Sequence, residues 1–166
     1  MQTKICSKCK QEKPVSEFGH HSQAKSGIAS QCLQCKREQS AAFRKTPEGI
    51  YLQIKGRTTF YKKNYNIRYK PITITKDEFV EWYNSQIKVC VYCDLPENQI
   101  KKIHGGHLDR VFRLTVDCVD NILGYAKGNL VLACNRCNLI KSNVFTFEEM
   151  KEIGKKYLKP KWQHKL

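Results

Sequence analysis

Eight of the nine cysteines in this 166-residue chain form four Cys-x-x-Cys pairs: Cys6/Cys9, Cys32/Cys35, Cys90/Cys93 and Cys134/Cys137. Two thiolates three positions apart can hold one side of a tetrahedral zinc ion, and a second pair must complete the coordination. The simplest arrangement joins the pairs in sequence order, which predicts two structural zinc sites. The alternative is unliganded cysteine or a thioredoxin-like redox pair, which four such pairs in one short chain disfavour.

Three further residues could bear on the ligands of these zinc sites. His20 and His21 could replace a cysteine ligand at the first site, although four cysteines are already available there. Cys118 is the ninth cysteine and stays outside both predicted sites.

The charge of the chain indicates a polyanionic partner. The formal net charge is +15, which two four-cysteine zinc sites would lower to about +11. Residues 36–70 alone carry +8, and their cations interleave with aromatic residues. This composition predicts a nucleic-acid-binding arm, with Lys62, Lys63 and Arg68 among its contacts. The alternative is an amphipathic helix that buries Tyr51, Ile54 and Phe60 beneath a solvated basic face.

The sequence gives no reason to expect a membrane partner. No run approaches 18 apolar residues, and the N-terminal MQTKICSKCK has no apolar core of the kind found in signal peptides. We expect the chain in the cytoplasm, or in another reducing compartment that contains nucleic acid, where cysteines bind metal rather than form disulfides.

Three capping signals predict helix starts. Thr46-Pro47-Glu48 places a capping threonine before a proline. Capping boxes begin at Thr75 and at Thr146. We expect the last helix to reach about Leu158, and the basic tail KPKWQHKL to lie on a surface or a partner.

The region after the third cysteine pair predicts two strands and a helix. A polar loop leads from Cys93 to a strand at 114–118, where apolar residues alternate. A turn with Gly124 and Gly128 leads to a second strand at 129–132, and the last cysteine pair opens a helix through Lys141. We divide the chain into an N-terminal zinc-binding module (1–38), a basic helical arm (39–72) and a zinc-bearing module with a C-terminal helix (73–166).

The stretch TVDCVDNILGYAKGNLVLACNRCNLIKS resembles the HNH endonucleases, especially the small zinc-bearing proteins of phages and mobile elements, which include homing endonucleases. The shared pattern is an aspartate in the first strand, then Asp-Asn, Gly-Tyr, Asn-Leu, Cys-x-x-Cys-Asn and Lys. The N-terminal cysteine pairs and basic arm resemble the DNA-binding extension of many such proteins. The resemblance implies an α+β fold, a small ββα-metal (HNH) module on a four-cysteine zinc site, and Mg²⁺-dependent cutting or nicking of DNA.

The resemblance also implies roles for individual residues. Asp117 matches the metal-binding acid of the first strand, and Asn138 matches the second metal-binding position, on the helix. A carboxylate and an amide oxygen suit Mg²⁺. Asn129 matches the asparagine that braces the loop between the strands. Lys141 matches a basic position expected to face the phosphates, and Arg136 is a further residue that we expect to contact nucleic acid.

The general base is the weak point of this match. HNH enzymes usually carry a histidine directly after the first-strand acid, and this chain has Cys118 there. A thiol is a poor base for this task, although related proteins often have arginine at this place. His107 or Asp120 could serve instead, and His107 could equally be a surface histidine. Alternatively, HLDR at 107–110 could be the catalytic strand, with Asp109 as its metal-binding acid. Asp109 lies 29 residues before Asn138, whereas Asp117 lies 21 before it, and the shorter separation suits a compact two-strand unit better.

Two functions therefore remain open from the sequence. The first is a Mg²⁺-dependent endonuclease that prefers DNA to RNA. The second is an HNH-derived scaffold that binds DNA or RNA without cutting it, within a larger nucleoprotein assembly. Cys118 and the large positive charge favour the second, and the retained Asp117, Asn129 and Asn138 favour the first.

Overall fold

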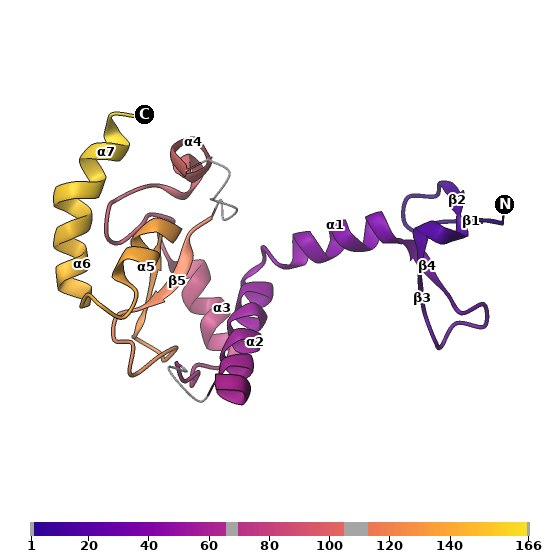
Figure 1. The fold of residues 1–166 in the computed structure, drawn as a ribbon, viewed down its shortest axis with the longest axis horizontal. Coiled ribbons are helices and arrows are strands. Elements are labelled where there is room, and N and C mark those ends of the chain that lie inside the picture. Colours follow the sequence, from indigo (N-terminus) through magenta and orange to yellow (C-terminus); the bar gives the residue numbers. More distant parts are fainter. Residues whose placement is uncertain (1, 66–69, 105–112, 166) are drawn as a thin grey trace. The chain divides into compact units, whose positions relative to one another are not determined.

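The computed structural model describes residues 2–65, 70–104 and 113–165, except the side chains of residues 60–65 and 104. The chain divides into two compact units, Met1–Gln53 and Ile54–Leu166. The boundary lies within the segment 39–72 that the sequence predicted as a separate arm. Figure 1 traces the elements of both units in chain order.

Two short hairpins and a helix build the N-terminal unit. Strand β1 (Thr3–Ile5) pairs with β2 (Glu12–Pro14), and β3 (Phe18–His20) pairs with β4 (Ile28–Cys32). The 3-10 turn η1 (Val15–Glu17) joins the hairpins, and helix α1 (Leu33–Phe43) starts at the second cysteine pair. The core contains Phe18 and three cysteines, Cys6, Cys32 and Cys35. This cluster around the cysteines is small, so a metal bound by them would contribute much of its stability.

Helix α2 (Pro47–Tyr65) begins where the sequence predicted. The hydroxyl of Thr46 accepts a hydrogen bond from the amide of Gly49 at 3.2 Å, as a capping residue should. Tyr51 and Ile54 are buried, so this part of the predicted basic arm packs an apolar face inward. The side chain of Phe60 lies outside the described residues.

The C-terminal unit contains, among its described residues, one strand pair and several helical segments. Both predicted capping boxes are present, at Thr75 and Thr146. The turn η2 and helix α4 occupy a segment that we expected to be loop, because Ile100 and Ile103 give it a buried apolar side. The elements are α3 (Lys76–Ser85), η2 (Glu97–Gln99), α4 (Ile100–His104), β5 (Thr115–Cys118), β6 (Leu130–Ala133), α5 (Asn135–Lys141), α6 (Phe147–Ile153), η3 (Gly154–Leu158) and α7 (Lys159–Gln163).

The expected ββα arrangement is confirmed in this unit. Strands β5 and β6 pair antiparallel, with Thr115 opposite Ala133 and Cys118 opposite Leu130. Helix α5 follows directly at the last cysteine pair. The residue before β5 is tied to η2, because the amide of Leu114 donates to the Glu97 carboxylate at 2.8 Å.

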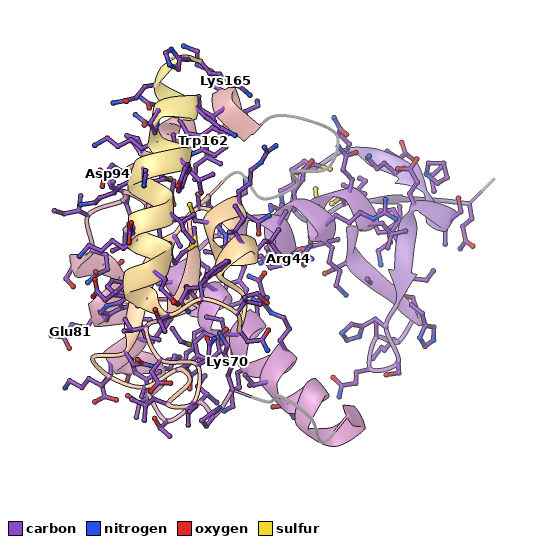
Figure 2. All side chains as sticks on the ribbon, turned by 60° about the vertical axis from the view of Figure 1, so that its left-hand side comes forward. Arg44, Lys70, Glu81, Asp94, Trp162 and Lys165 are labelled. Atoms are coloured by element: carbon purple, nitrogen blue, oxygen red, sulfur yellow. The ribbon has the colours of Figure 1, made fainter. Side chains whose placement is uncertain are left out.

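The C-terminal segment differs from the prediction. The helical path continues past Leu158 through η3 and α7 to Gln163. Trp162, labelled in Figure 2, is buried there beneath the guanidinium of Arg136, so part of the tail packs on the protein itself. Gly154 permits a close approach, because a methyl group there would lie 2.3 Å from the carbonyl oxygen of Tyr92. Along the described helices, none is long and apolar enough to cross a membrane.

Candidate metal centres and the surroundings of Asp117

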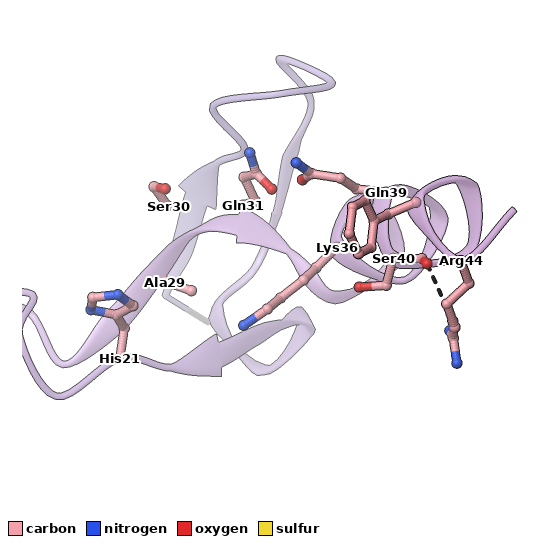
Figure 3. A pocket seen from close by; sticks show the side chains of 9 residues that line it. His21, Ala29, Ser30, Gln31, Lys36, Gln39, Ser40 and Arg44 are labelled. Carbon is pink, nitrogen blue, oxygen red and sulfur yellow. Dashed lines mark hydrogen bonds between the residues drawn. The ribbon is translucent and has the colours of Figure 1, made fainter. Parts of the chain in front are cut away.

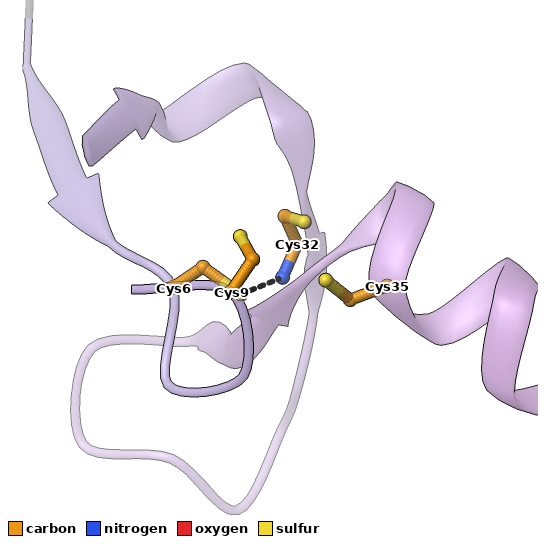
Figure 4. Close-up of side chains that lie close together, drawn as sticks. All are labelled: Cys6, Cys9, Cys32 and Cys35. Atoms are coloured by element: carbon orange, nitrogen blue, oxygen red, sulfur yellow. Dashed lines mark hydrogen bonds between the residues drawn. The ribbon is translucent and has the colours of Figure 1, made fainter. Parts of the chain in front are cut away.

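The first four-cysteine group lies in the N-terminal unit (Figure 4). The sulfur atoms of Cys6, Cys9, Cys32 and Cys35 all lie within 4.8 Å of one another. The backbone amide of Cys32 donates to Sγ of Cys6 at 3.3 Å. This contact is the main reason that the pKa of Cys6 falls to about 6, which favours the thiolate form that binds metal.

The second group lies in the C-terminal unit and is fully buried. It consists of Cys90, Cys93, Cys134 and Cys137. Sγ of Cys93 lies 3.8 Å from Sγ of Cys134. Four sulfurs bound tetrahedrally to zinc at about 2.3 Å would be about 3.8 Å apart. Both groups pair in sequence order as predicted, and either could hold a zinc ion.

Asp117 is buried in the middle of β5, with 2% of its surface exposed. The hydroxyl of Tyr92 donates to Oδ2 at 2.7 Å, and the amide of Cys118 donates to Oδ1 at 2.8 Å. Burial, and then the charge of Asp117, raise the pKa of Tyr92, so the phenol keeps its proton and remains a donor.

Two lysine ammonium groups also face this carboxylate. Nζ of Lys141 lies 3.5 Å from Oδ2, and Nζ of Lys70 lies 3.8 Å from Oδ1. Lys141 is itself buried and donates to the carbonyl oxygen of Cys118 at 2.9 Å. Its amine therefore points inward in this structure, and the phosphate contact expected of Lys141 stays a prediction.

Asn138 lies against the same strand. Its amide nitrogen donates to the hydroxyl of Thr115 at 3.0 Å. Thr115 and Asp117 are two positions apart on β5, so their side chains point to the same face. Helix α5 thus brings Asn138 and Lys141, which are one turn apart, to the face that carries Asp117.

Asn129 holds the loop between the two strands. Its Oδ1 accepts from the amide of Asp120 at 2.9 Å, while its Nδ2 donates to the carbonyl oxygens of Asp120 and Gly124 at 2.8 and 2.7 Å. Asparagine supplies both a donor and an acceptor, which a leucine or an aspartate could not.

The braced loop then positions Lys70. Gly124 has φ +63, and a methyl group there would lie 2.3 Å from the carbonyl oxygen of Pro71. The amide of Tyr125 donates to that same oxygen at 2.8 Å, and Ile72 bridges to Tyr125. Segment 70–74 is therefore docked on the loop, which places Lys70 beside Asp117. Sequence reasoning missed Lys70, because no local pattern links it to a residue 47 positions away.

Cys118 is unsuited to be the general base. Its side chain is fully buried, and burial raises the pKa of its thiol to about 11. Asp120, another candidate base, accepts a hydrogen bond from the amide of Ile122 at 2.7 Å. His107 lies outside the described residues, as do the side chains of Lys62 and Lys63 and the whole of Arg68. The competing Asp109 lies outside them as well.

The carboxylate of Asp117 and the side-chain oxygen of Asn138 are hard oxygen ligands of the kind that Mg²⁺ prefers. A carboxylate has about four lone-pair sites, and here two accept hydrogen bonds while ammonium groups face the others. These four partners already balance the charge of the carboxylate, so a cation that binds here would have to replace at least one ammonium group. Asp117 and Asn138 have the ligand chemistry that the sequence resemblance implied, and their role as metal ligands stays a prediction.

The N-terminal unit carries a groove with a volume of about 530 Å³ between the β3–β4 hairpin and helix α1 (Figure 3). Lys36 lines it from the helix, Arg44 from the position directly after the helix, and His21 from the hairpin. Gln31 and Gln39 add amide groups. No acidic residue lines this groove in the described part of the chain, so it suits a phosphate-bearing ligand.

Comparison with known proteins supports the fold assignment. No protein-family model matches the chain, and no curated protein matches it in sequence. A solved structure of the rare-cutting HNH restriction endonuclease PacI matches with a TM-score of 0.57 and 24% identity, over 96% of this chain and 95% of that one. The expected α+β fold with an HNH module is confirmed: the chain has the fold of an HNH endonuclease.

Proposed function

We propose that this protein is a divalent-metal-dependent nuclease that acts on DNA. The observation that carries the proposal is the placement of Asp117 and Asn138 on one face of a ββα unit whose fold matches an HNH endonuclease. PacI is a restriction endonuclease described for its perturbation of DNA, and the net charge of +15 suits the same partner.

In this proposal Asp117 and Asn138 hold one Mg²⁺ ion. When bound, the ion would stabilise negative charge that develops on the leaving oxygen of a phosphodiester. Tyr92 and the Cys118 amide orient the carboxylate by their hydrogen bonds at 2.7 and 2.8 Å. Asn129 keeps the neighbouring loop in place, and zinc at the four-cysteine groups would stabilise both units.

Nucleic acid would bind through basic residues of both units. The arm residues Lys62, Lys63 and Arg68 remain proposed contacts, and so does Lys141. Arg136 packs on the ring of Trp162, its guanidinium carbon 5.8 Å from the ring centroid, so any phosphate contact would use its outer edge.

A second candidate function is a nucleic-acid-binding scaffold without catalysis. The observation that favours it is the buried thiol of Cys118, which cannot take a proton from water at neutral pH. Such a protein would bind DNA or RNA within a larger nucleoprotein assembly and would need zinc in the same way.

A nuclease assay separates the two functions. Plasmid DNA and a structured RNA are incubated with the zinc-loaded protein, either with Mg²⁺ or with no divalent cation added. The proposal predicts nicked or linear plasmid with Mg²⁺ and intact plasmid without it. Tight binding of plasmid with no cleavage under any condition favours the scaffold, and cleavage of RNA alone refutes the preference for DNA.

A further inference from the structure

Two lysines face Asp117, and they differ in how firmly they are held. Lys141 is 1% exposed and has a second partner, the carbonyl oxygen of Cys118 at 2.9 Å. Lys70 lies at the longer distance, 3.8 Å, and 31% of its side chain is exposed. The ammonium group of Lys70 can therefore move from the carboxylate into solvent. Moving Lys141 would also break its hydrogen bond to the Cys118 carbonyl oxygen.

The two oxygens of the Asp117 carboxylate also differ in how firmly their partners are held. Oδ2 is enclosed by Tyr92 and Lys141, which are both buried. Oδ1 accepts from the amide of Cys118 and faces Lys70. A cation would therefore reach the carboxylate at Oδ1, once Lys70 has moved away.

The position of Lys70 is built into the fold. Pro71 docks on Gly124 and Tyr125, and the amides of Thr73 and Ile74 both donate to the carbonyl oxygen of Tyr125, at 3.0 and 3.1 Å. These contacts hold the backbone next to Lys70, while its long side chain keeps its freedom. The backbone of Lys70 thus stays beside Asp117, while its ammonium group can approach the carboxylate or leave it.

Charge decides what can replace it. One carboxylate already faces two ammonium groups, so a divalent cation beside Lys70 would add like charge where little water screens it. A nucleic-acid phosphate would attract the exposed ammonium group of Lys70 and relieve that repulsion.

We propose that Lys70 is a resident counter-ion of Asp117, which a divalent cation must replace and which nucleic-acid phosphate draws away. The proposal rests on the proposed function, because it takes Asp117 as a metal ligand. It makes Lys70 a positioning residue that couples metal binding to nucleic-acid binding, so the metal binds weakly until nucleic acid is present.

Calorimetric titration of zinc-loaded protein with Mn²⁺ tests this coupling, with and without a duplex oligonucleotide. The variants are Lys70→Met, Lys70→Gln, and Lys155→Met, which removes the same charge from an exposed position on η3. The heat measured when the Asp117→Asn variant is titrated with Mn²⁺ is subtracted from each titration, so that only Mn²⁺ binding that depends on Asp117 is counted.

Without DNA, both Lys70 variants should bind Mn²⁺ about 10-fold more tightly than the wild type and Lys155→Met, a typical coupling between two ligands. With DNA, this difference should shrink to less than about threefold. A purely structural role would instead weaken Mn²⁺ binding when Lys70 is replaced.

Two failures can be told apart. If Asp117-dependent Mn²⁺ binding is present but the Lys70 variants match the wild type or bind more weakly, the inference is wrong and the proposed function stands. If no Asp117-dependent binding occurs with or without DNA, the proposed function is wrong, and the inference falls with it.

Discussion

The carboxylate of Asp117 has an unusually complete set of partners for a proposed metal ligand. A tyrosine, a backbone amide and two lysines surround it, and 2% of the residue is exposed. Breaking a buried ion pair by removing one partner costs about 3–5 kcal/mol. Asparagine also removes this charge, but it keeps the size of the side chain and an oxygen that can accept from Tyr92, so it is a better probe than alanine.

Cys118 provides a test of the base assignment at the same scale. Cys118→Ser should leave Mg²⁺-dependent cleavage within about threefold of the wild type, because removing a true general base typically costs about 100-fold or more. The buried thiol has its pKa raised to about 11 and touches no solvent. Cleavage rates under single-turnover conditions measure the effect, and a loss of about 100-fold would mean that the thiol takes part in the reaction.

Among the structural elements, the loop between β5 and β6 does more than connect the strands. It carries the docking site for segment 70–74, and Asn129 braces it with three hydrogen bonds. A non-glycine residue in the left-handed backbone conformation of Gly124 costs about 1–3 kcal/mol. Gly124→Ala should lower the free energy of unfolding by more than this, because the methyl group would also lie 2.3 Å from the Pro71 carbonyl oxygen.

Gly128→Ala is the matched control for this loop. Gly128 has φ +78, but a methyl group there would meet no atom within 4 Å. This variant carries only the backbone strain, so urea unfolding should show a clearly smaller loss than for Gly124→Ala. Equal losses would contradict the docking of Pro71 on the loop.

The cysteine pairs are the elements on which folding should depend most. Cys93→Ser should remove one of about two zinc ions per chain and unfold the C-terminal unit, because metal affinity in such sites is folding free energy. Cys118→Ser removes another buried cysteine of the same unit and should keep both ions. Elemental analysis together with thermal unfolding decides this, and full zinc content in Cys93→Ser would refute the second site.

For the whole molecule, the affinity for DNA should depend in part on the positive charge of the N-terminal unit. Lys36→Ala combined with Arg44→Ala removes two cations from the groove of the N-terminal unit. The slope of log affinity against log salt for duplex DNA should then fall by about 0.9 per lost phosphate contact. Lys8→Ala combined with Lys25→Ala removes two exposed lysines outside the groove lining. An equal effect of both pairs would show that the groove is not a preferred contact.

How far the sequence predicts this molecule depends on the range of the interactions. Helix starts at Thr46, Thr75 and Thr146 follow from local capping, and the two cysteine groups follow from regular spacing. Packing between segments distant in sequence brings Lys70 beside Asp117 and Trp162 beneath Arg136, so no local sequence pattern predicts these contacts. The inward direction of Lys141 has the same origin, because a lysine on a helix gives no sign of which face is buried.

The most direct test of the nuclease proposal is cleavage of plasmid DNA by Asp117→Asn, measured with Mg²⁺ beside the wild type and beside Asp77→Asn. Asp77 is an exposed acid on α3, with 93% of its side chain accessible, so its variant controls for the loss of one negative charge. The proposal predicts that Asp117→Asn folds, binds zinc and DNA, and cleaves at least about 100-fold more slowly than the other two proteins, as expected when a metal ligand is lost. Undiminished cleavage by folded Asp117→Asn would contradict the assignment of the metal site to Asp117.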